Sequence, residues 1–176
     1  MPQVRTDIVD VYVFRRANAK VAGRVDADTP QRTAHGAAVE FLQLRRSTGP
    51  LAATWQTVMG HVNPGETAVQ TALRELKEET GFTPPVLVGL WQLEELNSYF
   101  LASRDAIMLS PCFAAEVAPG AEPALNDEHD AHRWVKRDHA GRHFVWPGQR
   151  AAIEGICRDI LAADSTVREI LRIKLE

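Results

Sequence analysis

Four charged residues that lie close together, Arg74, Glu75, Glu78 and Glu79, are the part of the sequence best suited to chemistry. On a helix, the three glutamates fall within one arc of roughly 100°. Like charges at these spacings repel each other by a few tenths of a kcal/mol per pair, and the C-terminal end of a helix disfavours anions. We therefore expect compensating positive charge, from an i,i+4 pair of Arg74 with Glu78 or, more effectively, from a divalent cation.

Mg²⁺ is the cation that this pattern favours. It takes oxygen ligands and keeps several waters, which suits a site that holds phosphate oxygens and delivers a nucleophilic water. The alternative is a solvated, Glu-rich helix face, and the carboxylates alone do not exclude it because short motifs also match by chance. The residues around the carboxylates decide between the two interpretations.

A helix of about 13 residues is predicted to carry these charges. Thr67 and Gln70 are the residue types of a capping box, and Gly81 suits the left-handed position that ends a helix. The apolar residues between them recur with a period of 3.6, at Ala68, Val69, Ala72, Leu73 and Leu76. The glutamates lie about a quarter-turn from that arc, so we expect them at the exposed rim of the buried surface.

The other elements favour an α/β fold. Strands are predicted from β-branched and aromatic content at 7–14, 37–44, 55–59, 86–96, 106–117 and 132–135. Residues 15–35 are predicted as a long hairpin connection, 103–105 as a turn and 117–127 as a loop. Helical spacing predicts a C-terminal helix from Pro147 and a further helix over 165–175. This order predicts an α/β/α sandwich in which the charged helix and the C-terminal helix cover opposite sides of a mixed sheet.

The composition is that of one soluble globular domain spanning residues 1–176. The hydrophobic fraction is 45% and the charged fraction 24%. With a net charge of −3, the chain lacks the basic excess that nucleic-acid backbones demand, so we expect a small phosphorylated ligand and no nucleic-acid partner. The chain lacks an apolar run of about 20 residues and a signal-peptide pattern, so we expect no membrane partner and a cytoplasmic location. Cys112 and Cys157 show no CxxC spacing, which favours reduced thiols.

Residues Gly60 to Phe82 resemble the box of the Nudix (MutT-like) hydrolase family. The family pattern is Gly-x5-Glu-x7-Arg-Glu-apolar-x-Glu-Glu-x-Gly-apolar. Its fixed positions are filled by Gly60, Glu66, Arg74, Glu75, Glu78, Glu79 and Gly81, with Leu76 and Phe82 at the apolar positions. Aromatic Phe82 is a mild departure, because the family usually has an aliphatic residue there.

The resemblance implies the Nudix α/β/α fold and Mg²⁺-dependent hydrolysis of a diphosphate bond in a small phosphorylated metabolite, with Mn²⁺ as a substitute ion. It implies that Glu75, Glu78 and Glu79 bind the metal and that the carbonyl of Gly60 adds a ligand. It also implies a structural role in the motif for Glu66, Arg74 and Gly81. Which carboxylate acts as the general base varies within the family and stays open here.

Three further stretches resemble the dihydroneopterin triphosphate pyrophosphatase branch of the family, at 55–60, 128–134 and 146–153. This branch cleaves pterin or nucleoside triphosphates to the monophosphate and pyrophosphate, and we rank it first. A second resemblance, carried by 55–56 and 63–66, is to dinucleoside polyphosphate and RNA 5′-pyrophosphate hydrolases. It ranks lower because their Pro-Gln-Gly-Gly stretch is Val58-Met59-Gly60-His61 in this sequence.

Glu128 is predicted to supply a carboxylate from outside the helix, because the resembling branch has an acidic residue at this place. It would serve as a further metal ligand or as the general base, since a carboxylate outside the first coordination shell is better tuned to accept a proton. The alternative is a solvated loop acid beside Asp127 and Asp130.

Several residues are candidates for substrate binding. Arg45 would neutralise a terminal phosphate, or be a solvated strand end, while Arg46 is expected to face the other way. His61 would contact phosphate. Tyr99 or Phe100 would stack on a base or pterin ring, with core packing expected for at least one of them.

The aromatic and histidine residues that remain are assigned structural roles. Trp91, Trp134 and Met108 are expected in the core or at its edge. The pair His129 and His132 is interpreted as exposed loop histidines in preference to a zinc site, because no cysteine or third histidine lies nearby.

Two functional classes fit this sequence: an enzyme, and a Nudix-fold module that binds a nucleotide without cutting it. A degenerate module would be expected to lose box carboxylates, and all three are present. The enzyme is therefore favoured. The physiological substrate and the oligomeric state stay open, with a homodimer as one outcome.

Overall fold

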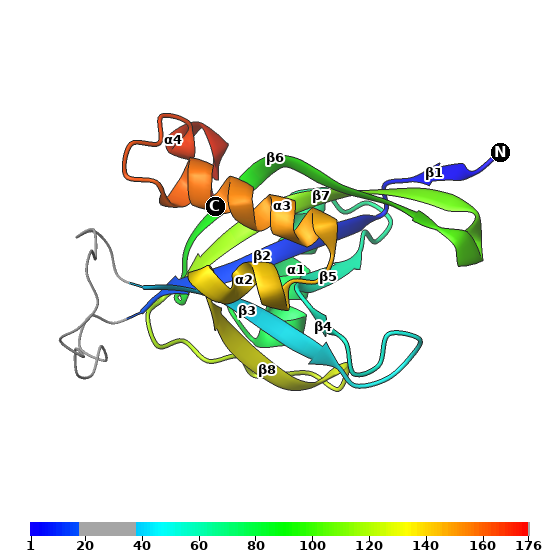
Figure 1. Cartoon of the computed structure of the whole chain (residues 1–176), viewed down its shortest axis with the longest axis horizontal. Helices are drawn as coiled ribbons and strands as arrows, with labels where there is room; N and C mark the ends of the chain where they lie inside the picture. The colour runs from blue at the N-terminus through cyan, green and yellow to red at the C-terminus, as the bar shows by residue number, and fades with distance from the viewer. Residues whose placement is uncertain (18–37, 176) are drawn as a thin grey trace.

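The computed structural model describes residues 1–17 and 38–175. Within them, a curved mixed sheet of nine strands lies between helix α1 (Ala68–Thr80) on one side and helix α3 (Pro147–Gly155) on the other (Figure 1). The strands are β1 (Gln3–Arg5), β2 (Ile8–Arg16), β3 (Val39–Arg46), β4 (Trp55–Gln56), β5 (Val58–His61), β6 (Leu87–Leu101), β7 (Ala106–Val117), β8 (His129–Lys136) and β9 (Arg172–Ile173). This arrangement confirms the predicted α/β/α sandwich.

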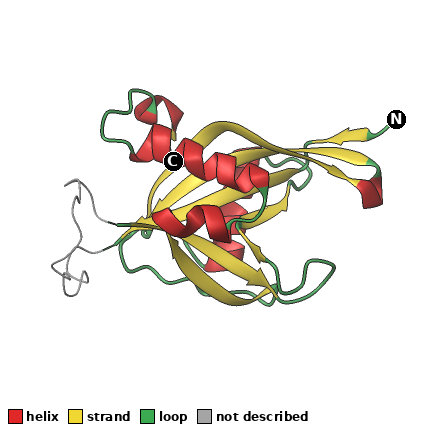
Figure 2. Cartoon of the chain, viewed as in Figure 1, coloured by secondary structure: helices red, strands yellow, loops and turns green. Residues whose placement is uncertain are grey.

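Strand β2 is the centre of the sheet. It pairs in parallel with β7 and antiparallel with β3 and β5. β7 pairs with β1 and forms a long antiparallel hairpin with β6, and β8 pairs with β3. The hairpin end and β1 project from the body of the molecule (Figures 1 and 2).

Alternation along β2 divides the core into two layers. Val9, Val11 and Val13 pack with Ala72 and Leu76 of α1. The side chains of β2 that point to the other face, Tyr12 and Phe14, belong to a second layer on the side of α3. This layer also includes Trp91, Ile153 and Ile156. Successive strand residues point to opposite faces, so a strand buried on both sides reads as a continuous apolar run. The expected positions of Trp91 and Met108 in the core are confirmed.

The predicted boundaries of α1 are confirmed by its caps. The backbone N–H of Gln70 donates to Thr67 Oγ1 at 3.2 Å, and that of Thr67 donates to Gln70 Oε1 at 2.8 Å. Gly81 has a φ of 71°, and its N–H donates to the carbonyl of Lys77 at 2.9 Å. Cap residues act within one turn of the chain, which is why local sequence predicts them.

Several other predicted boundaries differ from the structure. The third predicted strand divides at Thr57 into β4 and β5, and β8 begins at His129 instead of residue 132. β1 was not predicted. α3 continues as a π-helical segment to Leu161, and the predicted 165–175 helix is only α4 (Arg168–Leu171), followed by β9. The predicted long connection lies mostly at 18–37, outside the described residues.

Two expectations from composition can be compared with the fold. Cys112 and Cys157 are both free thiols, as expected. Among the helices of the described ranges, none is long and apolar enough to cross a membrane. The short helix α2 (Ala140–His143) completes the helical elements, together with single 3-10 turns at Ala102–Arg104 and Arg137–His139.

Candidate active site

Arg74 is the centre of the charged face of α1. Its guanidinium donates to Glu66 Oε1 at 2.8 Å and Oε2 at 3.0 Å, and to the carbonyl of His61 at 2.9 Å. It also donates to Glu75 Oε1 at 2.7 Å and to Glu78 Oε2 at 3.0 Å, which confirms the predicted i,i+4 pair. One side chain thus joins the end of β5, the following loop and α1.

Glu66 anchors the loop that leads into α1. Its carboxylate also accepts hydrogen bonds from the N–H of Asn63 at 3.1 Å and from the Thr71 hydroxyl at 3.0 Å. The hydrogen bonds from Arg74 are the main reason that the pKa of Glu66 falls to about 2. Glu66 is therefore saturated with donors, and these contacts agree with the structural role implied for it.

The Glu75 carboxylate lies directly against the backbone of Gly60. A Cβ atom built on Gly60 would lie 1.9 Å from the carboxyl carbon of Glu75 and from one of its oxygens. Only a residue without a side chain therefore lets the Glu75 carboxylate approach the β5 backbone. Burial raises the pKa of the half-buried Glu75, although hydrogen bonding to Arg74 opposes this shift.

Glu79 is buried, which corrects the prediction that it lies at an exposed rim. Its exposed fraction is 2%, and its Oε2 atom has no hydrogen-bond partner. Burial is the main cause that raises the pKa of Glu79 to about 9, and the charges of Glu75 and Glu128 add to the effect. The signal was present in the sequence, because Ala72, Leu76 and Glu79 follow i, i+4, i+7 spacing on one helix face.

Glu128 lies beside this group, at the end of the loop that precedes β8. Its side chain is exposed, Oε2 is 3.4 Å from a guanidinium nitrogen of Arg46, and its charge acts on both Glu75 and Glu79. The structure therefore brings Glu128 close to Glu75 and Glu79.

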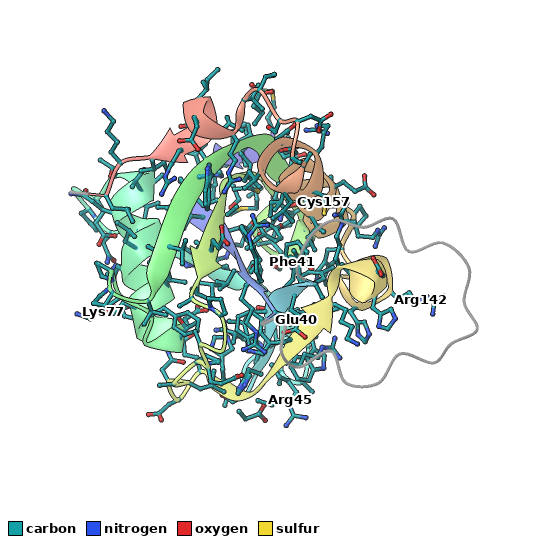
Figure 3. All side chains as sticks on the ribbon, turned by 90° about the vertical axis from the view of Figure 1, so that its left-hand side faces the viewer. Glu40, Phe41, Arg45, Lys77, Arg142 and Cys157 are labelled. Carbon is teal, nitrogen blue, oxygen red and sulfur yellow. The ribbon has the colours of Figure 1, made fainter. Side chains whose placement is uncertain are left out.

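Arg46 and not Arg45 faces the carboxylates, so the predicted orientation of these two residues is wrong. The pairing of β3 with β8 has a register shift between Arg45 and Arg46, which breaks the strand alternation that the prediction assumed. Arg45 donates instead to Asp130 at 2.6 Å and points outward (Figure 3).

His61 and Tyr99 do not join the carboxylates through their side chains. The exposed side chain of His61 lies near Asp7, whose pKa it helps to lower, and only its backbone carbonyl contacts Arg74. Tyr99 lies on β6, and the charges that act on its hydroxyl are those of Asp10, Arg104 and Asp7 instead of the helix carboxylates. Tyr99 and Phe100 are both exposed, so the expectation that one of them packs in the core is wrong.

The two histidines of the HxxH pair differ from their prediction. Both belong to strand β8, and His129 is buried, so neither is an exposed loop residue. His132 lies 3.1 Å from Glu122, which also accepts a hydrogen bond from the Trp134 indole at 3.0 Å. Trp134 packs at the edge of the core, as expected.

A buried polar group missed by the sequence analysis lies on the opposite side of the sheet. Asp10 is 1% exposed and accepts a hydrogen bond from the Asn97 amide at 3.0 Å, while its second oxygen has no partner. Burial raises the pKa of Asp10 to about 6. Strand alternation identifies position 10 as facing α3, but nothing in the local sequence indicates which polar groups meet it there.

The donor set of the site fits a divalent cation. Glu79 holds a buried carboxyl oxygen without a partner beside two other acidic residues, and with a pKa of about 9 it gives up its proton near neutral pH only when a cation lies close by. Oxygen donors are the ligands that Mg²⁺ prefers. Within the described ranges, no three acidic, histidine or cysteine side chains converge in a ready coordination set, and Glu75 and Glu78 are both hydrogen-bonded to Arg74.

Comparison with known proteins agrees with this fold. Residues 24–155 match the NUDIX domain family. The chain therefore belongs to the Nudix family and is a Nudix hydrolase, which acts on phosphoanhydride bonds.

Three individual proteins illustrate the relationship. The asymmetrical bis(5′-nucleosyl)-tetraphosphatase of Rattus norvegicus is 36% identical over 117 residues, which are 66% of this chain and 77% of that protein. A Myxococcus xanthus octanoyltransferase is 32% identical over 139 residues, or 74% of this chain, but the match spans only 38% of that protein's length. The C. elegans Ap4A hydrolase structure superposes with a TM-score of 0.62 at 21% identity, covering 87% of this chain and 96% of that one, and shows the shared fold.

Proposed function

We propose that this protein hydrolyses a dinucleoside polyphosphate asymmetrically. The observation that carries the proposal is its 36% identity to a tetraphosphatase of that type over 77% of the relative's length, together with a complete set of box carboxylates. This reverses the order in which the sequence resemblances were ranked. The departure at residues 58–61 from the usual stretch of these hydrolases therefore carries less weight than the similarity over the longer alignment.

The proposed reaction follows from the bonds of the substrate. A tetraphosphate bridge has one central anhydride bond and two outer ones. Cleavage at the centre gives two nucleoside diphosphates. Attack of water at an outermost phosphorus breaks an outer anhydride bond and gives one nucleoside monophosphate, with the nucleoside triphosphate as the leaving group. Asymmetrical hydrolysis is the second outcome.

In this proposal, Glu75, Glu78 and Glu79, with the Gly60 carbonyl, hold Mg²⁺, which Mn²⁺ can replace. When bound, the metal supplies positive charge that stabilises the charge developing on the phosphate oxygens. Arg74 keeps the loop and helix in register through its bonds to Glu66 and His61. Arg46 provides a cation for substrate phosphate beside the carboxylates, a role first assigned to Arg45.

Glu128 is proposed to take part as the general base or as a further ligand, supported by its position beside Arg46 and the helix carboxylates. If it is the base, Glu128→Gln lowers kcat by about 10²- to 10⁴-fold with little change in KM. If it is a ligand, raising Mg²⁺ recovers part of the activity. Asp127→Asn, in the same loop, is the matched control. Activity of Glu128→Gln equal to that control at every Mg²⁺ concentration removes Glu128 from the reaction.

The substrate class is tested by measuring kcat/KM with Mg²⁺ for diadenosine tetraphosphate, dihydroneopterin triphosphate, dATP and ADP-ribose. We expect diadenosine tetraphosphate to be the best substrate. A higher value for dihydroneopterin triphosphate or dATP would favour the pterin and nucleoside triphosphate branch, whose resemblance lies at 128–134 and 146–153. Tight binding of a nucleotide with no turnover of any compound would favour a binding module.

A further inference from the structure

The loop between β7 and β8 carries Glu128 at its last position, and we call residues 118–128 the Glu128 loop. In its first half, the Glu122 carboxylate accepts a hydrogen bond from the indole of Trp134 at 3.0 Å and lies 3.1 Å from Nε2 of His132. Both partners belong to β8. These contacts hold the first half of the loop against the sheet.

The middle of the Glu128 loop is attached to the end of α1. The N–H of Ala124 donates to the carbonyl of Thr80 at 2.9 Å. A Cβ atom built on Gly81 would lie 3.3 Å from the Cβ atom of Ala124, so the loop also packs closely against the residue that ends the helix. Thr80 directly follows Glu79 in the sequence. The loop therefore takes its place from the same turn of helix that carries the buried carboxyl group.

Ser47 holds the last two residues of the loop from the other side. Its N–H donates to the carbonyl of Glu128 at 2.8 Å, and its hydroxyl donates to the carbonyl of Asp127 at 2.7 Å. Ser47 directly follows Arg46, whose guanidinium lies 3.4 Å from the Glu128 carboxylate. Two consecutive residues at the end of β3 thus contact the backbone and the side chain of Glu128.

Asn126 fixes the turn in which Glu128 lies. Its side-chain oxygen accepts a hydrogen bond from the N–H of Glu128 at 3.2 Å and lies 3.3 Å from Nδ1 of His129. An amide oxygen only accepts hydrogen bonds, so Nδ1 of His129 carries the proton in this contact. The backbone carbonyl of Asn126 also accepts from the N–H of His129 at 3.2 Å. The direction in which the Glu128 side chain leaves the backbone therefore depends on Asn126.

We propose that Ser47 and Asn126 are positioning residues, which fix the backbone of Glu128 so that its carboxylate stays beside Glu75 and Glu79. This inference rests on the proposed part of Glu128 in the reaction. The Glu128 side chain is 57% exposed, so packing constrains it little and its position depends on the anchored backbone. A general base acts over about 2.6 to 3.2 Å, and a displacement of about 1 Å can cost up to about 10²-fold in rate.

Steady-state kinetics with Mg²⁺, on the best substrate of the panel above, test the proposal. Ser47→Ala and Asn126→Ala should each lower kcat about tenfold and leave KM within about twofold of wild type, because the geometry of the reacting groups changes and substrate binding does not. Ser47→Thr keeps a hydroxyl group and should restore most of the activity. Tm should fall by no more than about 4 °C in each variant, as expected for one hydrogen bond near the surface.

Ser165→Ala is the matched control. Ser165 is also a half-buried serine, and its hydroxyl donates to a backbone carbonyl, that of Asp159, in the segment that follows α3. The control variant loses the same kind of hydrogen bond outside the Glu128 loop. It should keep the kcat and KM of wild type.

A double-mutant cycle separates positioning of Glu128 from a general structural role. In a Glu128→Gln background, Ser47→Ala and Asn126→Ala should lower kcat no further, because they act through the group that is already removed. The same fold loss in both backgrounds overturns the proposal, since the two residues would then act on the whole site.

The failure of this inference differs from that of the proposed function. If Glu128→Gln lowers kcat while Ser47→Ala and Asn126→Ala keep the kcat of wild type, the part of Glu128 in the reaction stands and the positioning role is refuted. A Glu128→Gln protein with wild-type kcat refutes both. Wild-type protein that turns over no compound of the panel also refutes both, because no reaction then depends on where the carboxylate lies.

Discussion

Replacing Asp10 by asparagine is expected to stabilise the protein at neutral pH. Asp10 is almost completely buried, and one carboxylate oxygen has no partner. Burial raises its pKa from 3.8 to about 6, so the folded state still holds the proton at pH values where the unfolded chain has lost it. Stability therefore falls as the pH rises from about 4 to about 6, and the full penalty is present above pH 6.

The expected magnitude follows from that shift. A change of about two pKa units, at 1.36 kcal/mol per unit, corresponds to about 3 kcal/mol at neutral pH. Asparagine removes the charge and keeps an oxygen that can accept the hydrogen bond from Asn97. For a protein of this length, the gain corresponds to a Tm increase of roughly 6 to 12 °C.

Urea unfolding at pH 4 and pH 7.5 measures the effect. Asp10→Asn should exceed wild type in unfolding free energy at pH 7.5, and most of that difference should disappear at pH 4. Asp7→Asn is the matched control with the opposite sign, because hydrogen bonding from Arg5 lowers the pKa of Asp7. A stability difference for Asp10→Asn that is the same at both pH values, or a loss of stability at pH 7.5, refutes the reasoning.

Three further predictions concern the site. Glu79→Gln should abolish most turnover at saturating Mg²⁺, while the Tm measured without Mg²⁺ stays equal or rises, because burial disfavours the charged form of this carboxyl group; near-wild-type turnover would contradict this. Gly60→Ala should lower kcat about tenfold or more in steady-state assays, since its Cβ would collide with the Glu75 carboxylate. Arg46→Ala should raise KM about tenfold, whereas Arg45→Ala should change it little, because Arg45 pairs with Asp130. Equal KM values for the two arginine variants would show that the register shift has no functional consequence.

The elements that local sequence determines were predictable. The capping box at Thr67 and the stop at Gly81 depend on hydrogen bonds within one turn, and the structure reproduces both. The juxtaposition of Gly60 with the helix carboxylates also follows from the box, although its geometry required the fold. By contrast, β1 is three residues long and is formed by pairing with β7, about a hundred residues away in the sequence. No local sequence pattern therefore predicts this strand.

Side-chain directions were less predictable than elements. A single register shift between Arg45 and Arg46 reverses the inference drawn from alternation. We expected Tyr99 or Phe100 to lie in the core, because aromatic side chains usually bury a large area. Both are exposed, because the end of β6 that carries them projects beyond the helices (Figure 2). Whether a residue is covered depends on which elements reach it, and that information is not local.

The most direct test of the central claim is identification of the products that the purified protein makes from diadenosine tetraphosphate in the presence of Mg²⁺. Chromatography with 31P NMR distinguishes AMP and ATP from ADP. We predict AMP and ATP in equal amounts, with the reaction lost in Glu79→Gln. ADP as the only product, or an unchanged substrate under conditions in which the folded protein cleaves a pterin triphosphate, would contradict asymmetrical hydrolysis.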